Sequence, residues 1–319
     1  MTGRFMAVAA LALAAASAAS ADNFPARPVR VIVPFASGGS LDVLVRILGQ
    51  KLAESWKQPV VVDNRPGAGG NIGAEIVAKA IPDGYTLLTH SPSFAVNVSL
   101  QKNLAFDPVK DFAPVTLLGA SGSVLLVTPS LPVRSVGELI AHAKARPGEF
   151  TYASTGNGTA GHLNMELFKL LTGIDVVHVP YRVIAQAQTE LMSGRIALWI
   201  TTIPGALPHI QAGKMRALAV GSASRSTALP NVPTMMEAGI AYEASTWYGL
   251  YAPAGTPKTT VVKIYSGLRS VLATSDVKGR FSSLGVEPYG SSPEHLAKYL
   301  REEIAKWADV VKKTGMRLE

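Results

Sequence analysis

Cysteine is absent from all 319 residues, so disulfide bonds, thiol nucleophiles, thiolate metal sites and iron–sulfur clusters are excluded. A chain of this length buries enough apolar surface to fold without such cross-links. Histidine is also scarce. The six histidines are scattered, and no H-x-x-x-H or H-E-x-x-H pair of zinc ligands occurs among them. We therefore expect no metal ion and no other cofactor.

The sequence also lacks an apolar run long enough to span a bilayer, which requires roughly 20 residues. The run at residues 5–16 is shorter, follows Arg4, and precedes small residues at 19–21 that fit the A-x-A cleavage pattern. Residues 1–21 are therefore predicted to be a cleavable secretory signal peptide. We expect a mature protein that starts near Asp22, resides in the periplasm and does not insert into a membrane.

Several functional classes are missing their sequence signatures. The net charge is +8, but the basic residues are dispersed without a Lys/Arg-rich cluster, so nucleic acid is not an expected partner. No P-loop occurs, and the Gly-rich turn at residues 64–73 has Ile72 where a dinucleotide fingerprint needs its last glycine. At residues 119–123, Ser123 replaces the closing glycine of a nucleophile elbow. The chain is therefore expected not to be an enzyme.

Short β-branched strands alternate with helical patterns along the chain, which predicts an α/β fold with parallel strands. The first unit has a strand at residues 29–35, a turn rich in glycine and serine, and a helix over 41–56. A second series begins after about Pro129. The Pro-rich stretch at 204–208 predicts a loop, and an amphipathic helix at 293–313 ends the chain.

The two series predict two α/β lobes that are joined by two crossings of the chain. Lobe 1 is expected to comprise residues 22–122 and 250–319, and lobe 2 residues 123–249. Such an arrangement has a hinge, and the lobes can enclose a ligand in the cleft between them.

Two turns between a strand and a helix have the composition of an anion site. They are PFASGGSLD at residues 34–42 and YASTGNGTAGHL at residues 152–163. In each turn, glycines precede a Ser or Thr at the expected start of a helix. Exposed N–H groups and the helix dipole favour an anion at such a position. From composition alone, the alternative that both are simply well-capped turns stays open.

These turns belong to a set of segments that resemble the tripartite tricarboxylate transporter receptors, also called Bug receptors. The other segments include VDNRPGAGGNIG at residues 62–73, PDGYTLL at 82–88 and APAGTP at 252–257. The resemblance extends in order along essentially the whole mature chain. It implies a periplasmic binding protein fold of type II with two lobes, a hinge and an interlobe cleft, and it favours a functional role for the two turns.

The resemblance further implies that the two turns hold one carboxylate of a small organic acid, largely through backbone groups and water. Ser40 and Thr159 are expected to cap their helices, and Asp42 to brace its loop. The residues assigned to this site are Ser37, Gly38, Gly39, Ser40, Leu41, Asp42, Ser154, Thr155, Gly156, Gly158, Thr159, Ala160 and His162.

A second group of residues is predicted to form the distal wall that sets specificity, although each could equally belong to the core. These residues are Ser91, Ser93, Phe94, Tyr181, Arg182, Trp199, Thr202 and Trp247. Arg182 stands where the family usually has Lys. It is either a surface cation or a bidentate partner for a second carboxylate.

The implied partners are a small organic carboxylate and the inner-membrane permease subunits of a tripartite transporter. Two alternatives remain: a periplasmic receptor that passes ligand occupancy to a signalling partner, and a periplasmic α/β hydrolase.

Overall fold

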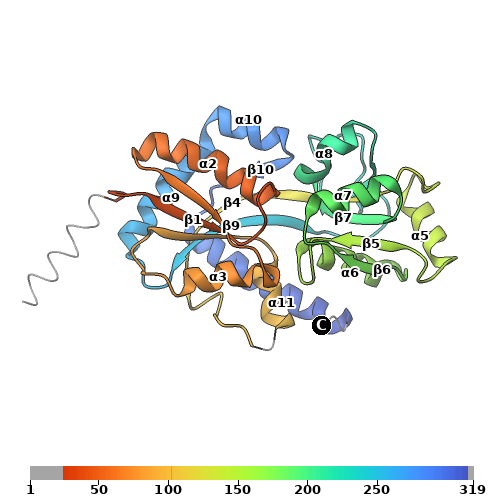
Figure 1. Ribbon diagram of the computed structural model, residues 1–319, viewed down its shortest axis with the longest axis horizontal. Helices are drawn as coiled ribbons and strands as arrows, with labels where there is room; N and C mark the ends of the chain where they lie inside the picture. Colours follow the sequence, from red (N-terminus) through yellow and green to blue (C-terminus); the bar gives the residue numbers. More distant parts are fainter. Residues whose placement is uncertain (1–23, 102, 315–319) are drawn as a thin grey trace, which may run out of the picture.

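The computed structural model describes residues 24–101 and 103–314, so the predicted signal peptide at residues 1–21 lies outside the described residues. The described helices and strands form two lobes, which lie on either side of Figure 1. Two strands, β4 (Phe112–Val127) and β9 (Ser245–Pro253), connect them. This architecture confirms the predicted α/β fold. No helix in the described part of the chain is long and apolar enough to cross a membrane.

Lobe 1 is a mixed sheet that is covered by helices on both faces. Strands β1, β2 and β3 are parallel, and β9 runs antiparallel between β3 and β4. Side chains alternate along β1, so that Val31 packs toward α2 and α9 whereas Ile32 packs toward α3 and α4. The elements of this lobe are β1 (Val29–Val33), α2 (Ser40–Trp56), β2 (Val60–Asn64), the 3₁₀ turn η1 (Ala68–Gly70), α3 (Asn71–Ala78), β3 (Thr86–His90), α4 (Ser93–Leu100), α9 (Lys258–Ala273), α10 (Ser275–Ser283) and β10 (Val286–Pro288).

Lobe 2 repeats this plan around the second part of β4. Strand β5 is parallel to both β6 and β7, whereas β4 is antiparallel to β7 and β8. Leu125 and Leu126 of β4 point into the cores on opposite faces. The elements of this lobe are α5 (Val136–Lys144), β5 (Thr151–Ser154), α6 (Ala160–Thr172), β6 (Val177–Pro180), α7 (Ile184–Ser193), β7 (Leu198–Thr202), α8 (Ile203–Gln211) and β8 (Arg216–Val220).

Helix α8 contradicts the loop that was predicted for residues 204–208. Pro204 lies in the first turn, where the missing N–H would have no partner within the helix and therefore costs nothing. Ala206 and Leu207 are buried, so packing against the sheet of lobe 2 stabilises the helix despite a second proline, Pro208.

The predicted lobe boundaries at 122/123 and 249/250 fall inside β4 and β9, which continue without interruption from one lobe to the other. The last helix, α11 (Pro293–Thr314), also connects the lobes and lies below β4 and β9 in Figure 1. Its Leu300 packs in a core of lobe 1, whereas its Trp307 packs in a core of lobe 2.

Candidate functional site

The parallel strands of both lobes end at the junction between the lobes, where the two anion-site turns lie. Strand β1 leads into the loop before α2, and β5 leads into the loop before α6. Ligands of open α/β sheets bind outside the carboxyl ends of the strands. Among the described residues, several close approaches cross the junction. The hydroxyl of Ser40 on α2 lies 2.7 Å from that of Thr202 at the end of β7. Gly39 and Gly69 of lobe 1 also lie close to lobe 2. The position that a Cβ atom would occupy at Gly39 is 3.7 Å from the Ile184 side chain, and the corresponding position at Gly69 is 3.6 Å from the Asn157 carbonyl oxygen.

Neither helix at this junction has a side-chain cap, which corrects the caps predicted for Ser40 and Thr159. Gly39, not Ser40, is the N-cap of α2, and the Ser40 hydroxyl is bonded to Thr202. Thr159 is the N-cap of α6, but its hydroxyl donates to the Gly156 carbonyl oxygen (2.7 Å) instead of accepting from the helix. The first N–H groups of a helix have no partner within it. Both helices therefore present N–H groups and the positive end of a dipole to the junction, where they can receive an anion.

Asp42 braces the loop before α2, as predicted. Its carboxylate is 2% exposed and accepts hydrogen bonds from Gly38 N (2.9 Å), Asn64 Nδ2 (3.0 Å) and Arg46 Nε (3.1 Å). Asn64 also donates to the Phe35 carbonyl oxygen. Burial opposes ionisation, but the Arg46 guanidinium and the other donors outweigh it, so the pKa of Asp42 lies below its usual value. The negative charge of Asp42 is thus largely neutralised by its partners within lobe 1, which weakens its repulsion of an anion at the junction.

The loop before α6 is held by side chains of lobe 2. Ser154 Oγ accepts from Gly156 N (3.0 Å) and lies 2.6 Å from His178 Nε2. His162 Nδ1 accepts from Gly158 N (3.1 Å). The rings of His162 and His178 stack with their centroids 4.3 Å apart, and Tyr152 stacks on His178 at 4.8 Å. His162 therefore supports the loop from within the lobe.

The distal-wall candidates divide into three groups. Phe94, Trp199 and Trp247 are buried in hydrophobic cores, and the Trp247 indole N–H donates to Glu303. The Tyr181 hydroxyl donates to Glu190 on α7 (2.5 Å). The others are Ser91 and Ser93, which are buried at the end of β3, Arg182, which is exposed after β6, and Thr202, which bonds to Ser40.

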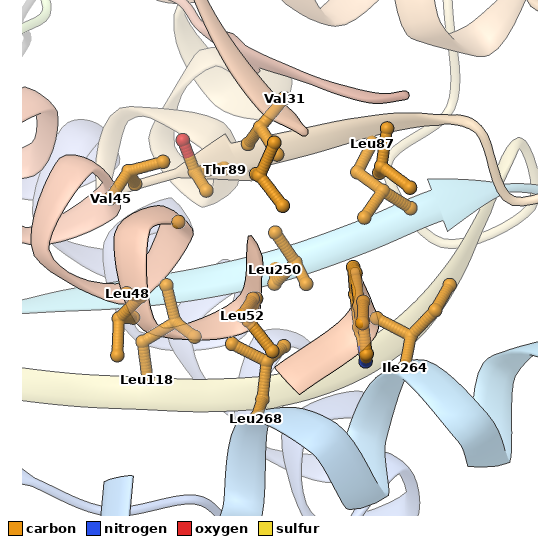
Figure 2. Close-up of a pocket in the computed structure, with 14 residues that line it drawn as sticks. Val31, Val45, Leu48, Leu52, Leu87, Thr89, Leu118, Leu250, Ile264 and Leu268 are labelled. Carbon is orange, nitrogen blue, oxygen red and sulfur yellow. The ribbon is translucent and has the colours of Figure 1, made fainter. Parts of the chain in front are cut away.

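Two cavities in the described part of the chain lie away from the junction. The first, shown in Figure 2, is a space of about 20 Å³ between the sheet of lobe 1 and helices α2 and α9. Its lining includes Val31, Leu48, Leu250 and Leu268, and the hydroxyl of Thr89 already donates to Ile32. A space of this size holds about one water molecule, and an apolar lining leaves a charge without partners. The second, about 200 Å³, lies at the ends of β5 and β7 that are opposite the junction.

Sequence patterns did not identify Arg46, Asn64 and His178 as residues that support the two turns. Arg46 follows Asp42 by four residues, a helical spacing that could have indicated their ion pair. Asn64 reaches Asp42 because β2 lies beside β1, which only the strand order reveals. The pairing of β5 with β6 brings His178 to Ser154 in the same way. Within the described residues, no group of three or more His, Asp or Glu side chains could hold a metal ion.

Two α/β lobes, joined by β4 and β9 and with uncapped helices at their junction, define a two-lobed solute-binding protein. A family model for the tripartite tricarboxylate transporter family receptor matches residues 44–316. The chain belongs to this family, whose members are solute-binding receptors and not enzymes.

Similar proteins extend over nearly the whole chain. It is 41% identical to protein BugT of Bordetella pertussis, and the match includes 99% of each chain. Among solved structures, "R. palustris Rpa4515 with adipate" is 38% identical with a TM-score of 0.88, covering 92% of this chain and 99% of that one. MatC (Rpa3494) from Rhodopseudomonas palustris with bound malate is 34% identical with a TM-score of 0.85, covering 90% of this chain and 100% of that one.

Proposed function

We propose that this protein binds a small organic acid between its lobes, with one carboxylate at the N-termini of α2 and α6. The observation that carries this proposal is the pair of helices whose first N–H groups lack a side-chain cap at the junction. Asp42 and His162, together with the other supporting residues, keep the loops in place, and Ser91, Ser93, Arg182 and Thr202 are candidates for contacts to the rest of the ligand. The adipate and malate complexes of similar proteins support a carboxylate as the ligand class.

The remaining parts of the proposal concern location and partners. Residues 1–21 direct export to the periplasm, and the loaded receptor delivers its ligand to inner-membrane permease subunits. Expression of the full chain in a Gram-negative host, followed by N-terminal sequencing of the periplasmic fraction, should give a start near Asp22. An uncleaved protein in the cytoplasm would contradict the export step.

A thermal-shift screen of the refolded mature protein against adipate, malate and other organic acids tests the ligand class. A ligand at a hundred times its dissociation constant adds about 2.7 kcal/mol to the free energy of unfolding, which gives a clear shift. We expect at least one acid to stabilise the protein and its uncharged amide to have no effect. Equal stabilisation by acid and amide, or none by any acid, would exclude the carboxylate site.

Ala160→Pro tests the site itself, because it removes one backbone N–H at the first position of α6. Proline is tolerated at that position, and Thr159 before it already has an extended backbone (φ −77°, ψ 161°). A lost hydrogen bond to a charged group corresponds to at least a tenfold loss of affinity. Ser275→Pro makes the same change at the exposed first position of α10, away from the junction, and should leave affinity unchanged. Full affinity in Ala160→Pro would argue against a carboxylate at α6.

A further inference from the structure

The loop between β5 and α6 turns two of its backbone N–H groups inward onto side chains. Gly156 N donates to Ser154 Oγ, and Gly158 N donates to His162 Nδ1. Gly158 has a φ of +72°, a conformation that glycine adopts without strain. Thr159 follows in an extended conformation, and the helix then begins at Ala160. The direction of the first N–H groups of α6 therefore depends on these inward bonds.

The bond from Gly158 sets the protonation state of His162. A backbone N–H can only donate, so Nδ1 of His162 must offer a lone pair. An imidazole that meets this condition is uncharged and carries its proton on Nε2. A proton on Nδ1 would place two donors against each other and break the contact with Gly158.

The surroundings keep the ring uncharged. His178 stacks on His162 at 4.3 Å, His162 is buried and His178 is half-buried, so a charge on either ring is unfavourable. Burial, together with the neighbouring His162, lowers the pKa of His178 to about 4, and burial also lowers the pKa of His162. Two charged groups on α6 also act on His162. Lys169 opposes protonation of the His162 ring, whereas Glu166 favours it. The Glu166 carboxylate already accepts from the Tyr152 hydroxyl (2.7 Å) and from Lys169 (2.9 Å).

We propose that His162, as an uncharged Nε2–H imidazole supported by the stacked ring of His178, is the positioning residue that directs the N-terminus of α6 toward the ligand carboxylate. This inference rests on the proposed carboxylate site. It assigns His162 an indirect role, in which the ring acts on the ligand site through Gly158.

Nitrogen-15 NMR of the unliganded protein tests the tautomer directly. We expect the ring of His162 to be protonated only on Nε2 at pH 7, because Nδ1 accepts from Gly158 N. A His162→Asn variant identifies the resonance. A ring that carries a proton on Nδ1 at pH 7, charged or uncharged, would overturn the proposal.

Two substitutions of His162 distinguish a role as hydrogen-bond acceptor from a role in packing alone. Asparagine at position 162 offers an oxygen near the place of Nδ1, whereas leucine fills the space without an acceptor. With adipate and malate as probes in calorimetry, we expect His162→Leu to lose about tenfold in affinity and His162→Asn to stay within about threefold. His295→Leu, on the exposed face of α11, is the control and should bind like the wild type. Equal losses in both position-162 variants, or no loss in His162→Leu, would refute the positioning role.

The two measurements separate this inference from the proposed function. If the wild type binds none of the acids, the carboxylate site is refuted, and the NMR measurement alone then decides whether His162 holds the loop. If the acids bind, affinity should be equal at pH 7 and pH 8, because the carboxylates stay ionised and the bond from Gly158 N keeps His162 uncharged. A loss of affinity from pH 8 to pH 7 would contradict an uncharged His162.

Discussion

Asp42 places a buried negative charge in the first turn of the helix that is proposed to receive a carboxylate. This charge would repel the carboxylate, but it is compensated by hydrogen bonds from the loop at Gly38 N, from Arg46 and from Asn64. Replacing Asp42 with alanine leaves Gly38 N and Asn64 Nδ2 without this acceptor. Hydrogen bonds to a charged group contribute about 1.5–3 kcal/mol each, so we expect urea unfolding to give a loss of about 2–3 kcal/mol. Affinity for the acid should fall as well.

Asp309→Ala is the control for this change. Asp309 also pairs with a residue four positions along its helix, Lys313, but both side chains are more than half exposed. Such surface pairs contribute little, so the loss should stay below about 0.5 kcal/mol. Similar losses in the two variants would show that Asp42 has no special bracing role.

His90 gives the stability of the protein a pH dependence. The ring is fully buried between Phe35 and Phe94, and its Nδ1 accepts from Ser91 N (2.9 Å). Burial lowers its pKa from 6.5 to about 4. In the unfolded chain, His90 binds a proton below pH 6.5, whereas in the folded protein it binds one only below about pH 4. The free energy of unfolding therefore falls as the pH drops from 6.5 to about 4.

A His90→Gln variant should show a smaller fall. Between pH 7 and pH 5, urea unfolding of the wild type is expected to lose about 2 kcal/mol more than this variant does. His178 contributes in the same direction in both proteins and does not affect the difference. The exposed His295→Gln variant should keep the wild-type pH dependence, and an unchanged slope in His90→Gln would rule out His90 as its source.

At the scale of elements, local patterns in the sequence predict most strands and helices. They fail where an element or a contact depends on residues that are distant in the sequence. The glycines before α2 and α6 and the β-branched strands before them are local signals, and both turns lie where they were predicted. Helix α8 was missed because its two prolines predict a loop. The packing that stabilises this helix comes from the sheet of lobe 2, which a local pattern does not reveal. The partner of Ser40 was missed because Thr202 lies 162 residues away, and no local pattern encodes such a contact.

A buried acid of α11, Glu303, joins this helix to β9. Glu303 is 7% exposed and accepts from the indole N–H groups of Trp247 on β9 (2.8 Å) and of Trp307 on α11 (3.1 Å). Glu303→Ala leaves both N–H groups without this acceptor, so we expect urea unfolding to show a loss of about 3 kcal/mol. Glu303→Gln keeps a carbonyl oxygen and should lose less. Glu302→Ala, on the exposed side of the same helix, should change stability little, and a comparable loss there would argue against the role of Glu303.

At the scale of the whole molecule, three continuous elements among the described residues link the lobes, namely β4, β9 and α11 (Figure 1). These elements limit how the lobes can separate, and the junction contacts act against that separation. The Ser40–Thr202 bond is such a contact, and it joins the start of α2 to the end of β7. Because it forms between lobes, it stabilises the arrangement in which both helix N-termini face the junction.

A double-mutant cycle measures this contribution. Ser40→Ala and Thr202→Val should each weaken binding of a screened acid, and the double variant should be little weaker than either, with a coupling of about 1 kcal/mol. The matched pair within one lobe is Thr128→Val and Ser130→Ala, whose hydroxyls lie 3.0 Å apart beside the cavity at the far end of lobe 2. That pair is expected to affect stability but not affinity. Additive losses for Ser40 and Thr202 would mean that each acts on the ligand separately, and closure would then depend on the ligand and not on this contact between the lobes.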